Sequence, residues 1–197
     1  MLSDPWFYAA AVPAVLISGV SKGGFGGGLG VVAVPLMALT VAPTQAAAIM
    51  LPILCVMDLV ALRAYRGRWD WRNLRVMLAG AGVGIAIGTL SFGTLPDDGI
   101  RLLIGAIAIG FTLERWLRRR DRPATVPSAW GGGFWSATAG FTSFVAHAGG
   151  PPVNVYLLPQ RLDRTVYQAT TVGFFAVINY VKLVPYAALG QFDGAAL

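Results

Sequence analysis

The sequence predicts an all-α fold of the polytopic membrane type, and its composition and hydropathy pattern carry that prediction. Only 12% of the 197 residues are charged and 56% are hydrophobic, whereas roughly a quarter of the residues in a soluble domain are charged. The mean hydropathy is +0.65. Apolar runs recur along the chain between short basic loops, and several approach the roughly 20 residues of a membrane-crossing helix.

The apolar runs define the expected helices of a single transmembrane domain, residues 1–197. In chain order they cover residues 6–21, 31–41, 46–62, 76–95, 100–113, 130–146 and 166–189. Gly80, Gly84 and Gly88 recur every four residues on one face of the fourth run, which predicts close packing against another helix. Two shorter segments, 28–41 and 151–158, follow glycine pairs and are predicted to be broken or re-entrant helices.

The basic residues predict the topology, because lysine and arginine concentrate in cytoplasmic loops. Five arginines crowd residues 63–75 and five more crowd residues 115–122, with Asp97 and Asp98 in the hairpin between them. The N-terminus is then outside, and all of the 15 basic residues except Arg101 and Lys182 face the cytoplasm. We therefore expect a multi-pass protein surrounded by lipid.

The composition argues against several other classes of protein. The net charge of +6 lies mainly in short loops, which is typical of topology signals rather than of a nucleic-acid-binding face. Cys55 is the single cysteine, so neither a disulfide framework nor a thiolate metal site can form. The glycines fit no phosphate-binding loop, and one histidine with scattered carboxylates offers no nucleophile–base pair. Neither an enzyme nor a cofactor is expected.

Two segments of the chain match each other at an offset of about 122 residues. Gly28 precedes Ala47 by 19 residues, as Gly150 precedes Ala169, and both copies end in Gly-x-aromatic-Asp, at 67–70 and 190–193. Odd numbers of spans separate equivalent points, which predicts two inverted-topology repeats of the kind found in secondary transporters. The copies cover about residues 5–120 and 128–197. The second lacks two spans, which indicates a fragment or a naturally short copy.

The stretch from Phe144 to Pro159 interrupts an apolar region with glycines and prolines. Irregular backbone at membrane depth is tolerated where protein or a water-filled cavity covers it. A helix that begins at Pro151 leaves uncapped N–H groups, and the positive end of its dipole attracts anions. We favour anion sites at the two glycine pairs, residues 27–28 and 149–150, over the alternative that these glycines only allow close packing.

A few ionisable residues lie inside or beside the apolar runs. Lys182 lies deep in the last run, where a lysine costs about 2.5–3.5 kcal/mol, and its partner is either Asp58, at comparable depth in the third run, or a substrate anion. Asn179 shares its helical face. His147 is either a structural helix-end residue or a proton carrier that couples anion movement to the proton gradient. Lys22, beside the first glycine turn, is either an attractant for anions or a cytoplasmic anchor, and we favour the anchor.

Several motifs occur together: a glycine-rich turn followed by Val-Pro-Leu at residues 23–36, the alanine-led third run, Tyr65-x-Gly67-x-x-Asp70 and the second glycine copy. Together they resemble the sulfite exporter TauE/SafE family. The resemblance implies a bacterial inner-membrane protein of inverted repeats that moves small anions, typically sulfite, sulfonates or related organosulfur compounds. The family usually has Thr-Ser after the alanine of the third span. Here the first copy has Ala48-Ile49 and the second has Thr170-Thr171, so the second copy alone offers hydroxyl groups.

These observations predict a secondary transporter, an exporter of a small anion such as sulfite or a sulfonate. The alternatives are a non-transporting membrane subunit and a transporter of another small anion, a carboxylate. The expected partners are the anion and membrane lipid, a homo-oligomer is left open, and no nucleic acid or metal is expected. The predicted substrate-binding residues are Lys22, Gly27, Gly28, His147, Gly149, Gly150, Asn154, Thr170, Asn179 and Lys182, and those predicted for coupling or an ion pair are Asp58 and His147.

Overall fold

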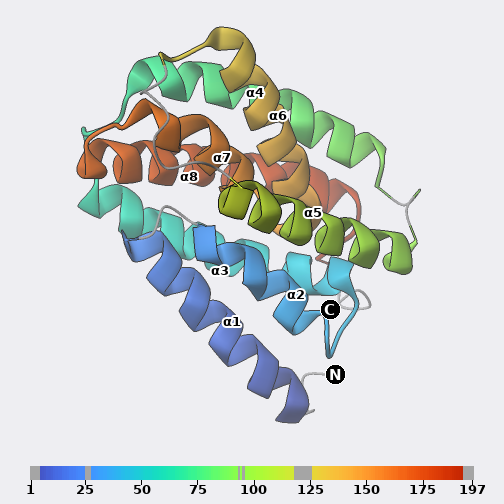
Figure 1. Cartoon of the computed structure of the whole chain (residues 1–197). Coiled ribbons are helices and arrows are strands. Elements are labelled where there is room, and N and C mark those ends of the chain that lie inside the picture. Colours follow the sequence, from blue (N-terminus) through green and yellow to red (C-terminus); the bar gives the residue numbers. More distant parts are fainter. Residues whose placement is uncertain (1–4, 25–27, 93, 95, 118–125, 193–197) are drawn as a thin grey trace.

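The computed structural model describes residues 5–24, 28–92, 94, 96–117 and 126–192, and these form helices joined by short loops. The long helices are α1 (Pro5–Gly24), α3 (Pro43–Ala64), α4 (Trp71–Leu90), α5 (Asp97–Leu117), α6 (Ala129–Ala146) and α8 (Arg164–Ala188) (Figure 1). The short ones are η1 (Gly28–Val32), α2 (Ala33–Met37), α7 (Gly150–Leu157) and η2 (Leu158–Gln160). No strand occurs in the described part of the chain, and the predicted all-α fold is confirmed.

Helices α4 and α6 form the most extensive helix–helix contact of the described fold. A Cβ atom at Gly84 would lie 1.9 Å from the carbonyl oxygen of Ala137, and one at Gly80 would lie 2.4 Å from that of Gly133. A Cβ at Gly88 would likewise meet a phenylalanine ring of α6 at 2.8 Å. Only glycine lets the two helices approach this closely. The predicted packing role of these three glycines is therefore confirmed.

The two short helical segments that follow the glycine turns lie against each other. Segment η1 contacts α7, and the long helices that follow them in the chain, α3 and α8, pack together (Figure 1). Helix α1 contacts η1, α2 and α3, while α6 contacts α7. Helices α1 and α6 end at Gly24 and Ala146, shortly before the predicted glycine turns, and the fold brings the segments that follow them to one place.

Three helices in the described residues are long and apolar enough to cross a membrane: α3, α4 and α8. Each also presents large apolar side chains on the surface, among them Val60, Val83 and Val184. Exposed apolar side chains of this size suit a lipid environment better than water. The further spans expected from the sequence remain predictions.

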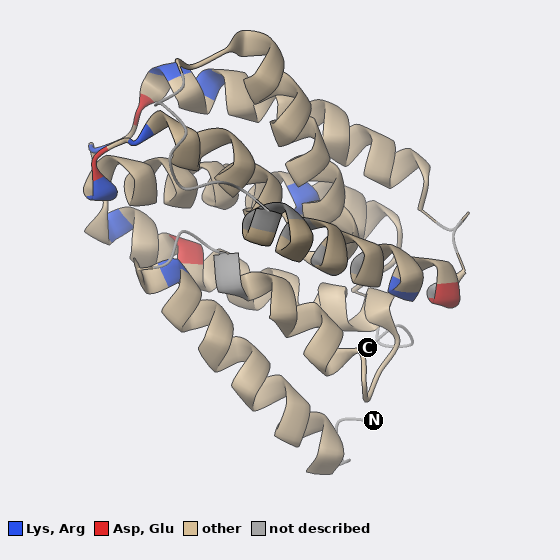
Figure 2. Cartoon of the chain, viewed as in Figure 1, with Lys and Arg blue, Asp and Glu red and all other residues tan. Residues whose placement is uncertain are grey.

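The arginines at the end of α3, in the loop that follows it, and at the starts of α4 and α8 gather at one end of the molecule (Figure 2). The side chain of Asn73 donates a hydrogen bond to Gln160 Oε1 at 2.8 Å and so ties the start of α4 to the segment before α8. Asp163 caps α8, and hydrogen bonds from the amides of Thr165 and Val166 hold the pKa of its carboxyl below the usual value. The basic stretches around residues 63–75 and 161–164 thus share one end. The basic residues 118–122 lie outside the described residues.

Candidate functional site

A small cavity lies where α1, η1, the end of α6 and the start of α7 come together. Its volume is about 30 Å³. Apolar side chains such as Met50, Leu54 and Phe175 form part of its wall. Its polar lining comprises Ser18, Lys22, Ser143, His147 and Asn179, with Gly150 at the start of α7. The structure thus brings four of the predicted site residues to one cavity, from both halves of the chain.

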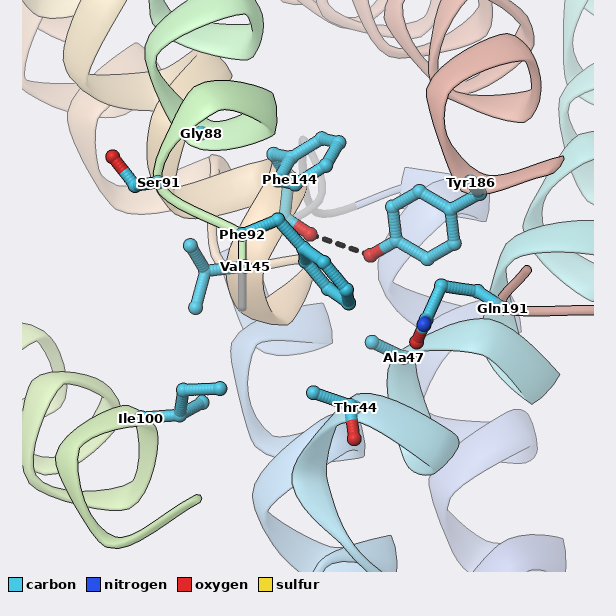
Figure 3. A pocket seen from close by; sticks show the side chains of 10 residues that line it. All are labelled: Thr44, Ala47, Gly88, Ser91, Phe92, Ile100, Phe144, Val145, Tyr186 and Gln191. Carbon is cyan, nitrogen blue, oxygen red and sulfur yellow. Dashed lines mark hydrogen bonds between the residues drawn. The ribbon is translucent and has the colours of Figure 1, made fainter. Parts of the chain in front are cut away.

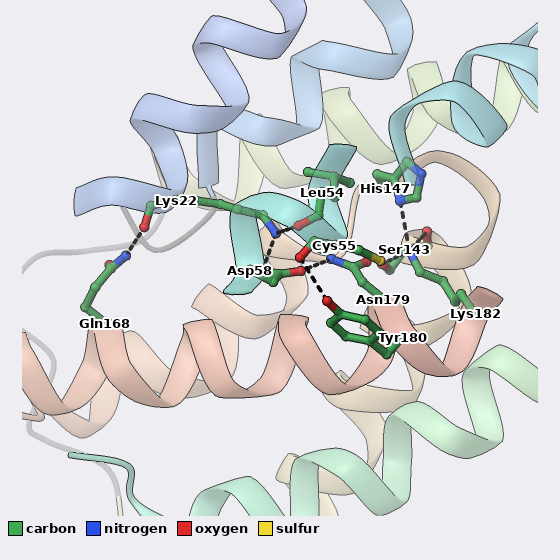
Figure 4. A network of polar contacts seen from close by, with 10 residues as sticks. All are labelled: Lys22, Leu54, Cys55, Asp58, Ser143, His147, Gln168, Asn179, Tyr180 and Lys182. Carbon is green, nitrogen blue, oxygen red and sulfur yellow. Dashed lines mark hydrogen bonds and ion pairs between the residues drawn. The ribbon is translucent and has the colours of Figure 1, made fainter. Parts of the chain in front are cut away.

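Lys22 of α1 reaches into the protein and forms an ion pair with Asp58 of α3 (Figure 4). The two side chains are 12% and 1% exposed. Lys22 Nζ also donates to the carbonyl of Leu54 at 3.3 Å, and Asn179 Nδ2 donates to the second carboxylate oxygen of Asp58 at 2.7 Å. The favoured interpretation of Lys22 as a cytoplasmic anchor is wrong, because its ammonium group lies against a buried carboxylate.

Lys182 of α8 is 0% exposed and has neutral hydrogen-bond partners. Its Nζ donates to the carbonyl oxygen of Ser143 at 2.9 Å, to the hydroxyl oxygen of Ser143 at 2.9 Å and to His147 Nδ1 at 2.8 Å (Figure 4). Three acceptors match the three protons of an ammonium group. The alternative of an Asp58–Lys182 ion pair is wrong: Lys22 and Asn179 occupy the carboxylate of Asp58.

His147 ends α6 in the left-handed region, with φ of 52°, which few residues other than glycine adopt. Thr142 clamps this turn: the Ala148 amide donates to its carbonyl at 3.2 Å, and its hydroxyl donates to the Ala148 carbonyl at 3.0 Å. His147 Nε2 lies 2.9 Å from the carbonyl of Ala47. Because a carbonyl can only accept, Nε2 carries the proton and Nδ1 offers its lone pair to Lys182.

The two glycines before α7 have different surroundings. Gly149 is the N-cap residue, no side chain caps the helix, and two prolines without N–H groups follow Gly150. A Cβ atom at Gly149 would lie 2.9 Å from the carbonyl oxygen of Ala139 and 3.0 Å from Ser143 Cβ. Gly149 therefore allows close packing, whereas Gly150 lines the small cavity. The helix begins one residue before the predicted position at Pro151.

The remaining predicted site residues lie elsewhere. The hydroxyl oxygen of Thr170 accepts a hydrogen bond from the Asp70 amide at 2.9 Å, and Asn154 Oδ1 accepts one from the Tyr167 hydroxyl. Neither Thr170 nor Asn154 lines the small cavity. Gly28 begins η1, and Gly27 lies outside the described residues.

A large cavity of about 280 Å³ is lined in part by Ala47 and Tyr186, which also contact the His147 ring (Figure 3). Its lining is mainly apolar, with Thr44, Ser91 and Gln191 as polar members. Tyr186 and Phe144 belong to its wall, and the Tyr186 hydroxyl donates to the carbonyl of Phe144 at 2.5 Å. The ring of His147 stacks on that of Tyr186, with centroids 6.5 Å apart. This wall therefore separates the large cavity from His147.

Three residues of the site were not among those predicted from the sequence: Ser18, Ser143 and Tyr186. The sequence contains a pattern that could have identified Ser143, because Ser21 precedes it by the repeat offset of 122 residues. A second pattern points to Tyr186, because it lies one helical turn after Lys182. No such pattern points to Ser18, because a serine in an apolar helix more often bonds its own backbone. Its buried hydroxyl has no hydrogen-bond partner in the described part of the chain.

The apolar helices and the buried charges together define a helical membrane protein with a polar site in its interior. The sequence model of the sulfite exporter TauE/SafE family matches residues 11–197, and the chain belongs to this family. It is therefore a membrane transporter of the sulfite exporter type, and the family is one of transporters rather than enzymes. No curated protein and no solved structure gives a significant match.

Proposed function

We propose that this protein is a secondary transporter that exports a small anion, such as sulfite, a sulfonate or a related organosulfur compound, across the bacterial inner membrane. The observation that carries the proposal is a surplus of buried positive charge beside the small cavity, where Lys182 bonds two residues of the cavity lining, Ser143 and His147. Among the described residues, Asp58 pairs with Lys22, while Lys182 donates to neutral acceptors. An anion in the cavity would supply the missing negative charge.

The lining of the small cavity offers further groups that favour an anion. The hydroxyl of Ser18 is buried and has no partner within the described residues, so it is available as a donor. Gly150 places the N-terminal end of α7, with its positive dipole, at the cavity. Lys182 can exchange a neutral acceptor for a charged one, and hydrogen bonds between charged groups are roughly twice as strong as neutral ones.

The size of the small cavity implies that transport requires a conformational change. A volume of about 30 Å³ accommodates about one or two water molecules, less than an anion such as sulfite needs. The large cavity is lined by Thr44 at the start of α3 and by Ser91 and Gln191 just after α4 and α8, which are the ends of these helices opposite the arginine-rich stretches. With the arginine-rich end in the cytoplasm, the large cavity lies toward the outside.

The order of the helices supports the repeat predicted from the sequence. A long helix, a short segment after a glycine turn and a second long helix occur in sequence twice, as α1–α2–α3 and α6–α7–α8. Helices of both predicted copies, about residues 5–120 and 128–197 of a single domain, contribute to the lining of the small cavity. In secondary transporters of this architecture, one repeat rocks against the other around a site between them.

Flux measurements with the purified protein in proteoliposomes test the proposal. We expect saturable counterflow of sulfite or methanesulfonate, and uptake into inside-out vesicles tests the export direction. Lys182→Gln keeps a hydrogen-bond donor but removes the charge, so it should abolish the flux. Arg101→Gln, which removes an exposed charge at the start of α5, is the matched control and should leave the flux unchanged. Wild-type vesicles without saturable flux of either anion would favour a non-transporting membrane subunit.

A further inference from the structure

His147 lies where one added proton changes the charge of the small cavity. Its Nδ1 lies 2.8 Å from Lys182 Nζ and its Nε2 lies 2.9 Å from the Ala47 carbonyl. With Lys182 as an ammonium group that donates to Nδ1, the imidazole is the neutral tautomer with its proton on Nε2. A proton can join Nδ1 only if Lys182 directs its hydrogen bond elsewhere, because two donors repel each other. An anion in the cavity is an acceptor to which Lys182 can turn.

The charges at the cavity then decide how many protons accompany each anion. Lys22 and Asp58 cancel each other, so Lys182 alone balances a single negative charge. A divalent anion leaves one negative charge uncompensated at a site where water does not screen it. Building on the proposed function, we infer that the Lys182–His147 pair takes up one proton when a divalent anion binds and none when a monovalent anion binds.

The step balances in protons and charge. The hydrogen bond from Lys182 Nζ to His147 Nδ1 breaks, and Nζ donates to an oxygen of the anion instead. A proton given up by the acid form of the buffer in the solvent joins the lone pair of Nδ1, and the new Nδ1–H donates to the same anion, whose covalent bonds do not change. His147 thereby determines whether a divalent anion is held as well as a monovalent one.

Most of the other titratable groups around His147 are already engaged. On α8, Tyr186 stacks on the His147 ring and donates to the Phe144 carbonyl. Lys22 of α1 and Asp58 of α3 form the ion pair, and the Tyr156 hydroxyl of α7 donates to Asn73. Cys55 of α3 is buried, and Arg101 at the start of α5 is exposed. His147 Nδ1 is the site that becomes free when Lys182 turns to an anion.

Calorimetric binding in buffers of different protonation enthalpy counts the protons directly. Sulfate and methanesulfonate are suitable probes, because neither changes its charge between about pH 6 and pH 8, the range in which histidine titrates. We expect uptake of about one proton per sulfate, and a roughly tenfold lower dissociation constant for each unit by which the pH falls. Methanesulfonate binding should be independent of pH.

Two variants distinguish the loss of a titrating group from a structural effect of the substitution. His147→Asn retains a residue that tolerates the left-handed backbone and a side-chain acceptor, but does not titrate, so proton uptake with sulfate should vanish. Tyr156→Phe removes the titratable hydroxyl of α7, which donates to Asn73 and does not line the small cavity, and should leave the uptake unchanged. The thermal stability of each variant shows whether it folds. If a variant does not fold, the number of protons that the wild type takes up with each anion still tests the inference.

The results of these binding measurements distinguish failure of the proton-uptake inference from failure of the proposed function. Sulfate binding without proton uptake, uptake that persists in His147→Asn, or binding of methanesulfonate alone would overturn the inference and leave the proposed function standing. If neither anion binds saturably, the proposed function fails and this inference fails with it.

Discussion

The two buried lysines near the small cavity have opposite surroundings. Lys22 enters from α1 and meets the carboxylate of Asp58, which Asn179 also bonds. Lys182 enters from α8 and meets the two oxygens of Ser143 and the ring of His147. One lysine is neutralised by the protein, and the other is solvated by neutral dipoles.

This difference assigns the two lysines different roles. An ion pair between α1 and α3, bonded to α8, ties both halves of the chain together, and loss of one partner would leave a buried charge uncompensated. An ionisable side chain without a countercharge at membrane depth is a candidate for function, since it raises the energy of the protein unless a ligand completes it. The following substitutions test this comparison.

Asp58→Asn should have the largest effect, because it leaves Lys22 buried without a carboxylate. Breaking a buried pair in this way typically costs about 3–5 kcal/mol, and we expect the free energy of unfolding to fall by that amount. Unfolding in mixed micelles with increasing denaturing detergent measures it. Asp98→Asn, at an exposed position of α5, is the control and should change stability by less than about 0.5 kcal/mol. A loss below about 1 kcal/mol at Asp58 would contradict the structural role of the pair.

Replacing each lysine with methionine should shift stability in opposite directions. Lys182→Met removes a charge without a countercharge, so in anion-free micelles it should raise the free energy of unfolding by up to about 3 kcal/mol. Lys22→Met strands Asp58 and should lower it. Both variants are measured by the same unfolding assay. If Lys182→Met destabilises the protein as much as Lys22→Met does, the two lysines are equivalent and the comparison fails.

The long helices and the approximate positions of the glycine turns could be predicted from the sequence. Apolar runs and the Gly-Gly and Pro-Pro pairs reflect local backbone preferences, which do not depend on the tertiary fold. The sequence also placed Lys182 and Asp58 at similar depth. It could not say which lysine meets the carboxylate, because that depends on how α1 and α8 are rotated against α3. The left-handed turn at His147 was equally hidden, since tertiary contacts rather than local propensity hold it.

The glycine pair at residues 149–150 offers a third test of the comparison, because these glycines lie beside Ser143, which accepts from Lys182. An added methyl group at Gly149 would press on the Ala139 carbonyl and on Ser143, so Gly149→Ala should lower stability by about 1–3 kcal/mol, as overpacking does. Gly150 lines the small cavity, so Gly150→Ala should weaken anion binding with a smaller loss of stability. Parallel unfolding and binding measurements on both variants separate the two effects. Equal losses of stability, with binding lost in step, would indicate that both glycines serve packing.

The smallest effect concerns two serines of α6 that are both 1% exposed, Ser143 and Ser136. Ser143 Oγ accepts from Lys182 at 2.9 Å, whereas the Ser136 hydroxyl has no partner in the described part of the chain. A hydrogen bond to a charged group contributes about 1.5 kcal/mol or more, so Ser143→Ala should lower the free energy of unfolding by about that amount. Ser136→Ala removes a buried polar group without a partner and should be neutral or stabilising. The difference should disappear in a Lys182→Met background, because Ser143 then has no ammonium group to accept from. A Ser143→Ala loss that persists in that background would show that Ser143 stabilises the helix itself rather than the buried charge.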